Sequence, residues 1–240
     1  MSLLELSFRH RSVLLLLPVS GVLLAALSPG PLDLSGMVAG GVVVLLGCAL
    51  RLWAVRAIGK RARVRRPGAK ELLVVGPYAH VRNPLYLANS AVAAGLAAAG
   101  GAGTWALLVL AGCLAIYALV VHHEESVLAQ TFGAAYDAYR AAVPRWFPRP
   151  SPAPRTHEEV VPWPWPEVLR REVGLVIGSP LALIGIWAVR TDLAPLRSFS
   201  HARALAVAAL VVAGFANLIS TEVQLRRHQA RRGGSGDAPS

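Results

Sequence analysis

The sequence predicts an all-α integral membrane protein with about six transmembrane helices, including a helical hairpin, and a cytoplasmic amphipathic helix. Hydrophobic residues make up 55% of the 240 residues and charged residues only 15%, whereas charged residues account for about 25% of an ordinary soluble domain. Six apolar segments approach or reach the roughly 17 to 25 residues that cross a bilayer. They are residues 13–27, 37–50, 85–99, 104–121, 173–189 and 204–219.

The distribution of basic residues predicts the side of the membrane that each connection faces. With the N-terminus inside, all of the 24 Lys and Arg residues except Arg190, Arg197 and Arg203 fall on the cytoplasmic side. This asymmetry agrees with the positive-inside rule. We therefore expect a multi-pass protein of the inner or plasma membrane, with both termini in the cytoplasm. The net charge of +11 then reports topology and affinity for anionic lipid headgroups, and not binding to nucleic acid.

The first apolar segment follows Arg9 and Arg11 and has features of a secretory signal, but five further apolar segments favour a retained span. The chain then divides into five expected parts. These are an N-terminal transmembrane pair at 1–49, a core of loop, transmembrane hairpin and cytoplasmic helix at 50–148, a Pro/Trp-rich connector at 149–172, a C-terminal transmembrane pair at 173–232 and a disordered tail at 233–240. The two long inner connections hold almost every residue able to do chemistry, so function should face the cytoplasm.

Small residues predict a tight hairpin between the third and fourth spans, because Gly100, Gly101 and Gly103 have permissive backbones. Beyond the fourth span, apolar and aromatic residues recur at steps of three or four. They predict one amphipathic cytoplasmic helix that docks on the membrane face of the bundle and ends before Pro144. Its apolar residues are Leu128, Phe132, Tyr136, Tyr139 and Val143.

The first candidate site is the run of residues 76–86, GPYAHVRNPLY. Asn83 suits the N-cap of the third span and Pro84 its first turn, which leaves backbone N–H groups and the positive dipole end at the inner interface. Arg82 stands beside that end, where an anion such as a cofactor carboxylate or a lipid phosphate would bind. The alternative is a capped helix start, with Arg82 reaching lipid headgroups and Tyr78 and Tyr86 as interface aromatics.

The second candidate site is His122-His123-Glu124-Glu125, at the inner end of the fourth span. Carboxylates next to a hydrophobic span are costly unless they are solvated or paired with a cation. On a helical wheel both acids flank the face that packs on the bundle, and Glu125 lies nearer its centre. Adjacent helical residues diverge by about 100° and no third ligand recurs one turn away, so no metal site is predicted. The alternative is a charged helix boundary in water.

The hairpin returns the chain to the side that it left, so we expect the two candidate sites to lie at the same depth on neighbouring helices. One pocket would then hold a zwitterionic, cationic cofactor. The acids would bind its ammonium group, and Arg82 with the helix dipole would bind its carboxylate.

Several separate motifs resemble the isoprenylcysteine carboxyl methyltransferase and phospholipid methyltransferase superfamily, in its bacterial form. They cover about residues 50–148 in the family's order and spacing. The motifs are Arg51-Leu52-Trp53-Ala54 to Gly59, Gly76-Pro77-Tyr78, Arg82-Asn83-Pro84-Leu85-Tyr86, Glu124-Glu125 to Leu128, Phe132-Gly133, Tyr136, Tyr139 and Val143-Pro144-Arg145.

The resemblance implies a membrane-embedded methyltransferase that takes its methyl group from S-adenosylmethionine and acts on a lipid-like or small hydrophobic acceptor. Glu124 would bind the ammonium group of the cofactor, with Glu125 as the second choice because the wheel places it nearer the buried centre. Arg82 and His122 complete the expected catalytic set. The other residues implied to contact the cofactor are Lys70, Glu71, Leu72, Leu73, Tyr78, Asn83, Pro84, Leu85 and Tyr86.

Two departures bear on the methyl acceptor. Asn83 stands where the isoprenylcysteine enzymes carry His, and Val120 stands where they carry an Arg for the substrate carboxylate. Val120 therefore argues against a prenylcysteine carboxylate, although isoprenylcysteine methyl ester formation stays an alternative. An amine acceptor would have to lose a proton, which His122 or His123 would take.

An alternative of another class is a non-catalytic multi-span protein, a transporter or scaffold, in which both candidate sites are helix caps and interface anchors. Transporters usually place polar groups at mid-membrane. The predicted spans have almost none, which favours the enzyme.

Overall fold

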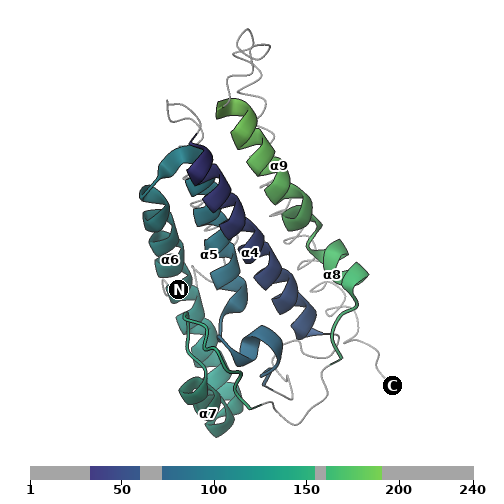
Figure 1. The fold of residues 1–240 in the computed structure, drawn as a ribbon. Helices are drawn as coiled ribbons and strands as arrows, with labels where there is room; N and C mark the ends of the chain where they lie inside the picture. The colour runs from purple at the N-terminus through teal and green to yellow at the C-terminus, as the bar shows by residue number, and fades with distance from the viewer. Residues whose placement is uncertain (1–32, 60–71, 155–160, 191–240) are drawn as a thin grey trace, which may run out of the picture.

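The computed structural model describes residues 33–59, 72–154 and 161–190, and these described residues form helices and no strand. The long helices are α4 (Leu34–Ile58), α5 (Pro84–Ala97), α6 (Trp105–Phe132) and α9 (Val173–Arg190). They run roughly side by side, and the short helices gather mainly at one end (Figure 1). The short elements are η1 (Gly76–Ala79), the π-helical turn η2 (Ala98–Ala102), α7 (Ala134–Ala142) and α8 (Trp165–Arg171). The predicted all-helical class is confirmed for these residues.

Three helical stretches are long and apolar enough to cross a membrane: Leu34–Ile58, Pro84–Ala102 and Trp105–Phe132. They correspond to the second, third and fourth predicted spans. The fifth predicted span falls on a shorter apolar segment of α9, Val173–Trp187. The first and sixth predicted spans and the predicted disordered tail lie outside the described residues.

Helices α4 and α5 approach closely through glycine. A Cβ atom at Gly40 would lie 2.4 Å from both the Ala99 nitrogen and the Gly95 carbonyl oxygen, and one at Gly95 would lie 2.7 Å from the Gly40 oxygen. Membrane helices associate largely by van der Waals packing, which small residues favour because they let backbones approach. Gly41, the next residue of α4, would meet nothing within 4 Å. Close packing therefore requires glycine on the face of α4 that contacts α5, at Gly40, but not on the face that carries Gly41.

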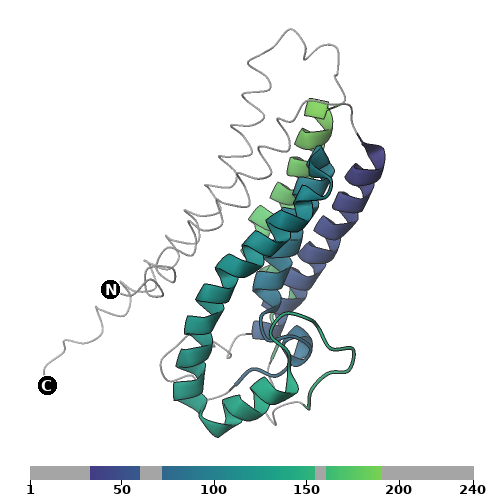
Figure 2. The same cartoon turned by 90° about the vertical axis from the view of Figure 1, so that its left-hand side faces the viewer.

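The turn between α5 and α6 is built from small residues, as predicted. Gly101 has φ 83° and Gly103 has φ 54°, in the left-handed region that glycine adopts without steric cost. Helix α6 then runs back along α5 and reaches α7 at the far end of the bundle (Figure 2). The beginning of α5 consequently lies beside the later part of α6.

The prediction of one continuous amphipathic helix after the fourth span is wrong. Helix α6 itself continues to Phe132, and Gly133 breaks the helix with φ 52° before α7 begins. The periodicity nevertheless identified a buried face. Tyr136, Tyr139 and Val143 share one cluster with residues of the loop before α5 and with Ala153, and Leu128 and Phe132 pack against it.

Candidate active site

The loop that leads into α5 is tied to the segment that follows α7. The Arg82 backbone N–H donates to the Pro144 carbonyl at 2.9 Å, and the Arg149 N–H donates to the His80 carbonyl at 3.0 Å. Backbone hydrogen bonds of this kind fix the path of both segments without any regular secondary structure. The position of Arg82 is therefore set by main-chain contacts from a distant part of the chain.

A tyrosine of α7 adds a side-chain tie to the same loop. The Tyr139 hydroxyl donates to the Tyr78 carbonyl at 2.8 Å. Burial raises the pKa of Tyr139 well above its ordinary value. Burial also raises the pKa of Tyr136 to about 12, and the nearby Glu125 carboxylate adds to that effect. Both tyrosines remain protonated at neutral pH, so Tyr139 keeps the proton that it donates to the loop.

Asn83 and Pro84 mark the start of α5, as predicted. However, the Asn83 side chain makes no capping hydrogen bond to the helix. Its Nδ2 atom donates to the Arg145 carbonyl at 3.4 Å instead. The predicted helix boundary is confirmed and the predicted capping bond is wrong, because the segment after α7 offers the amide another partner.

One hydrogen bond joins the two candidate sites. The Tyr86 hydroxyl donates to Oε1 of Glu124 at 2.8 Å. Tyr86 is buried in the first turn of α5, and Glu124 is half-buried near the end of α6. The structure thus brings these two sequence-predicted residues together across the hairpin.

Glu125 holds two arginines. Its carboxylate lies 3.4 Å from Nε of Arg82 and accepts a hydrogen bond from Nη2 of Arg145. The Arg82 and Glu125 side chains are only 10% and 9% exposed. The Arg82 contact is an ion pair and not a hydrogen bond, and Nη1 of Arg82 has no hydrogen-bond partner within the described ranges. The alternative in which Arg82 reaches lipid headgroups is therefore wrong, because its side chain turns inward to Glu125.

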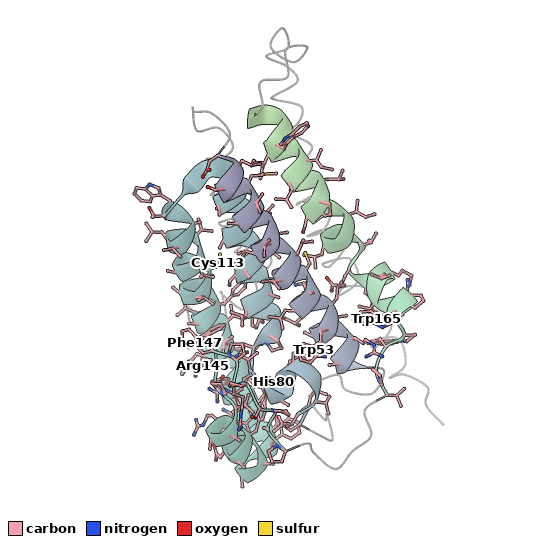
Figure 3. The ribbon with its side chains drawn as sticks, in the orientation of Figure 1. Trp53, His80, Cys113, Arg145, Phe147 and Trp165 are labelled. Carbon is pink, nitrogen blue, oxygen red and sulfur yellow. The ribbon has the colours of Figure 1, made fainter. Side chains whose placement is uncertain are left out.

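Arg145 and His80 lie at this end of the bundle, whereas Cys113 lies further along α6 (Figure 3). His80 belongs to the loop before α5, and its Nδ1 lies 2.8 Å from the Arg149 carbonyl oxygen. This end therefore gathers the loop, the start of α5, the end of α6 and the segment after α7.

The remaining sequence-predicted residues fall into three groups. Leu72, Leu73 and Pro84 are buried, and Tyr78 and Leu85 are half-buried. Lys70 and Glu71 lie outside the described residues. His122 is exposed, with no hydrogen bond or ion pair to any described residue, and His123 is half-buried.

A polar network inside the bundle was missed by sequence reasoning. Arg51 of α4 donates from Nε to Glu172 at 2.7 Å and from Nη1 to the Asn89 amide oxygen at 2.5 Å. Nδ2 of Asn89 in turn donates to the Tyr117 hydroxyl oxygen at 3.4 Å. The Tyr117 and Tyr86 rings lie 4.7 Å apart, centroid to centroid. The expectation that the spans hold almost no polar groups is therefore wrong.

The sequence did carry a signal for this network. Tyr86 and Asn89 are three residues apart on α5, and Tyr117 and Glu124 are seven apart on α6, so each pair shares one helix face. Arg51 was placed in a connection because the predicted second span stopped at the first charged residue. Helix α4 instead continues to Ile58, which carries Arg51 into the bundle.

No group of three His, Cys, Asp or Glu side chains that would hold a metal ion occurs in the described part of the chain. Cys48 and Cys113 are both free thiols. The described site therefore consists of carboxylates, guanidinium groups, amides and tyrosine hydroxyls.

Part of the chain is similar in sequence to a known family. Residues 35–135 match the phospholipid methyltransferase family. The chain is also 31% identical over 99 residues to the nickel-cobalt-cadmium resistance protein NccN of Alcaligenes xylosoxydans xylosoxydans. That alignment covers 41% of this chain and 43% of the other protein, so the chain spans less than half the length of this relative. No solved structure matches significantly.

The matched region contains Arg82, Tyr86, Glu124 and Glu125, and it ends before α8 and α9. It therefore includes both candidate sites and the helices that bring them together. The match confirms the superfamily that the motifs indicated: through residues 35–135, this chain is related to the phospholipid methyltransferases.

Proposed function

We propose that this protein is a membrane-embedded methyltransferase that uses S-adenosylmethionine and methylates a lipid-like or small hydrophobic acceptor. The family match supports methyl transfer in general. The observation that carries the proposal is the hydrogen bond from Tyr86 to Glu124 beside the pair of Arg82 and Glu125. Together these two contacts bring two carboxylates and a guanidinium group close to one another at one end of an apolar bundle.

These residues fit a zwitterionic cofactor. S-adenosylmethionine, when bound, supplies a methyl group on a positively charged sulfur. Nη1 of Arg82 is buried without a hydrogen-bond partner among the described residues, and leaving such a group unpaired is costly. A carboxylate would satisfy it, and the adjoining N-terminus of α5 favours a negative charge there. Glu124 would bind the ammonium group.

Glu124 is the better partner for the ammonium group, although Glu125 is more deeply buried. Glu125 already contacts Arg82 and Arg145, whose two positive charges exceed its single negative charge. The Tyr86 hydroxyl orients the Glu124 carboxylate without neutralising it. We infer that Glu125 holds Arg82 in place while Glu124 contacts the cofactor.

The work of the protein in this reaction is alignment and the exclusion of water. Methyl transfer from a sulfonium is an in-line displacement that needs little acid or base chemistry when the acceptor is a thiolate or a carboxylate. An amine acceptor would have to give up a proton, and His122 is exposed and His123 half-buried near Glu124. Either histidine would pass that proton to water.

We propose that this end of the bundle faces the cytoplasm. With the N-terminus placed inside, most Lys and Arg residues of the sequence lie on the cytoplasmic side, as the positive-inside rule requires. An apolar acceptor would reach the site sideways, between helices, from the bilayer. Val120 is fully buried and offers no cation to a prenylcysteine carboxylate. This favours another acceptor over isoprenylcysteine methyl ester formation.

Titration calorimetry of the purified protein in nanodiscs tests the cofactor directly. We expect the unchanged protein to bind S-adenosylmethionine and Glu124→Gln to weaken binding by about tenfold or more, since a charge-assisted contact is lost. Glu167→Gln is the matched control, because Glu167 pairs with Arg170 and Arg171 on α8. No binding by the unchanged protein would favour the transporter or scaffold alternative.

A further inference from the structure

The polar network reaches the candidate site from outside the family-matched region. Glu172 lies between α8 and α9, beyond residue 135 where the match ends. Its carboxylate contacts Arg51 twice, at 2.7 Å to Nε and 3.3 Å to Nη2. The Glu172 side chain is 11% exposed. A bidentate ion pair of this kind fixes the plane of the guanidinium group.

The orientation of Arg51 dictates that of Asn89. The third contact of the guanidinium group, from Nη1, goes to the Asn89 amide oxygen. An amide offers oxygen on one side and nitrogen on the other, so the nitrogen of Asn89 is turned toward α6. There it donates to the Tyr117 hydroxyl oxygen at 3.4 Å. One carboxylate thus determines the arrangement of two uncharged groups on two other helices.

Asn89 and Tyr117 each keep one donor hydrogen for which the described residues provide no acceptor. Tyr117 is 4% exposed, and its own hydroxyl proton has no acceptor in the described part of the chain. The second N–H of Asn89 likewise has none there. A buried polar group without a partner carries a desolvation cost, which applies to the Tyr117 hydroxyl, whereas Asn89 is half-buried. An oxygen atom of a bound molecule would accept from both.

The location suits a methyl acceptor. Tyr117 precedes Glu124 by seven residues, two turns along the same face of α6 and about 10 Å deeper in the bundle. Its ring packs on Tyr86, the residue that contacts Glu124. The charge of Arg51 is balanced by Glu172, and Val120 supplies none. The described surroundings therefore suit an uncharged oxygen better than a carboxylate.

We propose that Asn89 and Tyr117 bind an uncharged oxygen, such as a carbonyl or hydroxyl oxygen, in the apolar part of the methyl acceptor. Glu172 is a positioning residue that acts on this pair through Arg51. This acceptor subsite, defined as Asn89 and Tyr117, rests on the proposed function and extends it to the acceptor. It also gives the junction of α8 and α9 a part in the reaction.

The test measures cofactor binding and methyl transfer separately. The protein is reconstituted in nanodiscs that contain graded amounts of polar lipid extract from its host, and tritiated methyl groups of S-adenosylmethionine are followed into the lipid. Tyr117→Phe and Glu172→Gln are compared with Glu167→Gln. Tyr117→Phe keeps the buried ring and removes only the hydroxyl group, so it leaves the packing in place.

We expect Tyr117→Phe and Glu172→Gln to keep cofactor affinity within about threefold, to raise the apparent KM for the extract and to lower transfer by about tenfold or more. The double variant should transfer no less methyl group than the less active of the two single variants, because both changes disable the same acceptor subsite. Glu167→Gln should behave like the unchanged protein. Equal transfer by Tyr117→Phe, or additive losses in the double variant, would overturn the subsite.

The same experiment separates the two proposals. If the unchanged protein binds the cofactor but Glu172→Gln weakens that binding as much as Glu124→Gln does, the acceptor role of the network is overturned and the enzyme remains. If the unchanged protein binds the cofactor but labels no lipid, a lipid acceptor is overturned, and the subsite with it. If it binds no cofactor, both proposals end.

Discussion

Glu124 and Glu125 are adjacent on α6, yet their carboxylates contact different groups. Glu124 accepts a hydrogen bond from the neutral Tyr86 hydroxyl, whereas Glu125 lies between the guanidinium groups of Arg82 and Arg145. Neighbouring positions on a helix diverge by about 100°, so one carboxylate faces α5 and the other faces the loop and the segment after α7. These different contacts fit the two roles proposed above, in which Glu125 holds Arg82 in place and Glu124 binds the cofactor.

The first prediction separates these tasks by stability. Glu125→Gln should lower the free energy of unfolding by about 3 kcal/mol, because it leaves two partly buried guanidinium groups without their counter-ion. Glu124→Gln should lower it by less than about 1 kcal/mol, since a hydroxyl can also donate to an amide oxygen. Denaturation in detergent, followed by circular dichroism, measures both. Equal losses in the two variants would contradict the division of roles.

The second prediction concerns the contact of α4 with α5. Gly40→Val should destabilise the protein by about 2 kcal/mol or more, because its Cβ would collide with the backbone of α5. Gly41→Val is the matched control, with open space around the same atom, and should change stability by less than about 1 kcal/mol. Thermal unfolding in nanodiscs compares the two. An unchanged unfolding temperature in Gly40→Val would show that the helices do not pack in this way.

The third prediction concerns the break between α6 and α7. Gly133→Ala should cost about 1 to 2 kcal/mol through backbone strain alone, since Gly133 has φ 52° and nothing lies within 4 Å of its Cβ position. Gly112→Ala meets equally open space inside α6 and should be neutral or stabilising by up to about 1 kcal/mol. Chemical denaturation distinguishes the two effects. A stabilising Gly133→Ala would indicate a continuous helix through this point.

The fourth prediction concerns acceptor choice. Prenylcysteine analogues should be poor substrates, because buried Val120 offers no cation to their carboxylate. The assay compares label transferred to such an analogue with label transferred to host lipid extract by the same preparation, and the lipid arm serves as the activity control. Transfer to the analogue that equals or exceeds transfer to the lipid would show this inference to be wrong.

Much of this architecture was predictable from the sequence. Apolar length predicted α4, α5 and α6, and the glycines at positions 100, 101 and 103 predicted the turn. From these followed the expectation that the two candidate sites lie at the same depth, because a tight hairpin returns the chain to the level at which it started. The hydrogen bond between Tyr86 and Glu124 was not itself predicted. The helical wheel also predicted correctly that Glu125 is more buried than Glu124.

The errors share a physical cause, which is that tertiary partners override local preference. Asn83 is a good N-cap residue by type, but the Arg145 carbonyl competes for its side chain. Arg51 looked like the end of a span because a charge in lipid is costly, but Glu172 and Asn89 provide compensation that lies far away in the sequence. Such pairings cannot be read from periodicity.

The length of α6 has a consequence for where the reaction would occur. Its 28 residues span about 42 Å, against roughly 30 Å for the hydrocarbon layer of a bilayer. If α6 crosses the bilayer along its normal, a helix of this length would extend past the acyl chains into water. Its residue Glu124 would then sit where a dissolved nucleoside can arrive, while Tyr117, buried in the bundle, would lie at the depth of the lipid tails. Helix α6 alone would thus connect the aqueous solution and the bilayer, each of which carries one of the reactants.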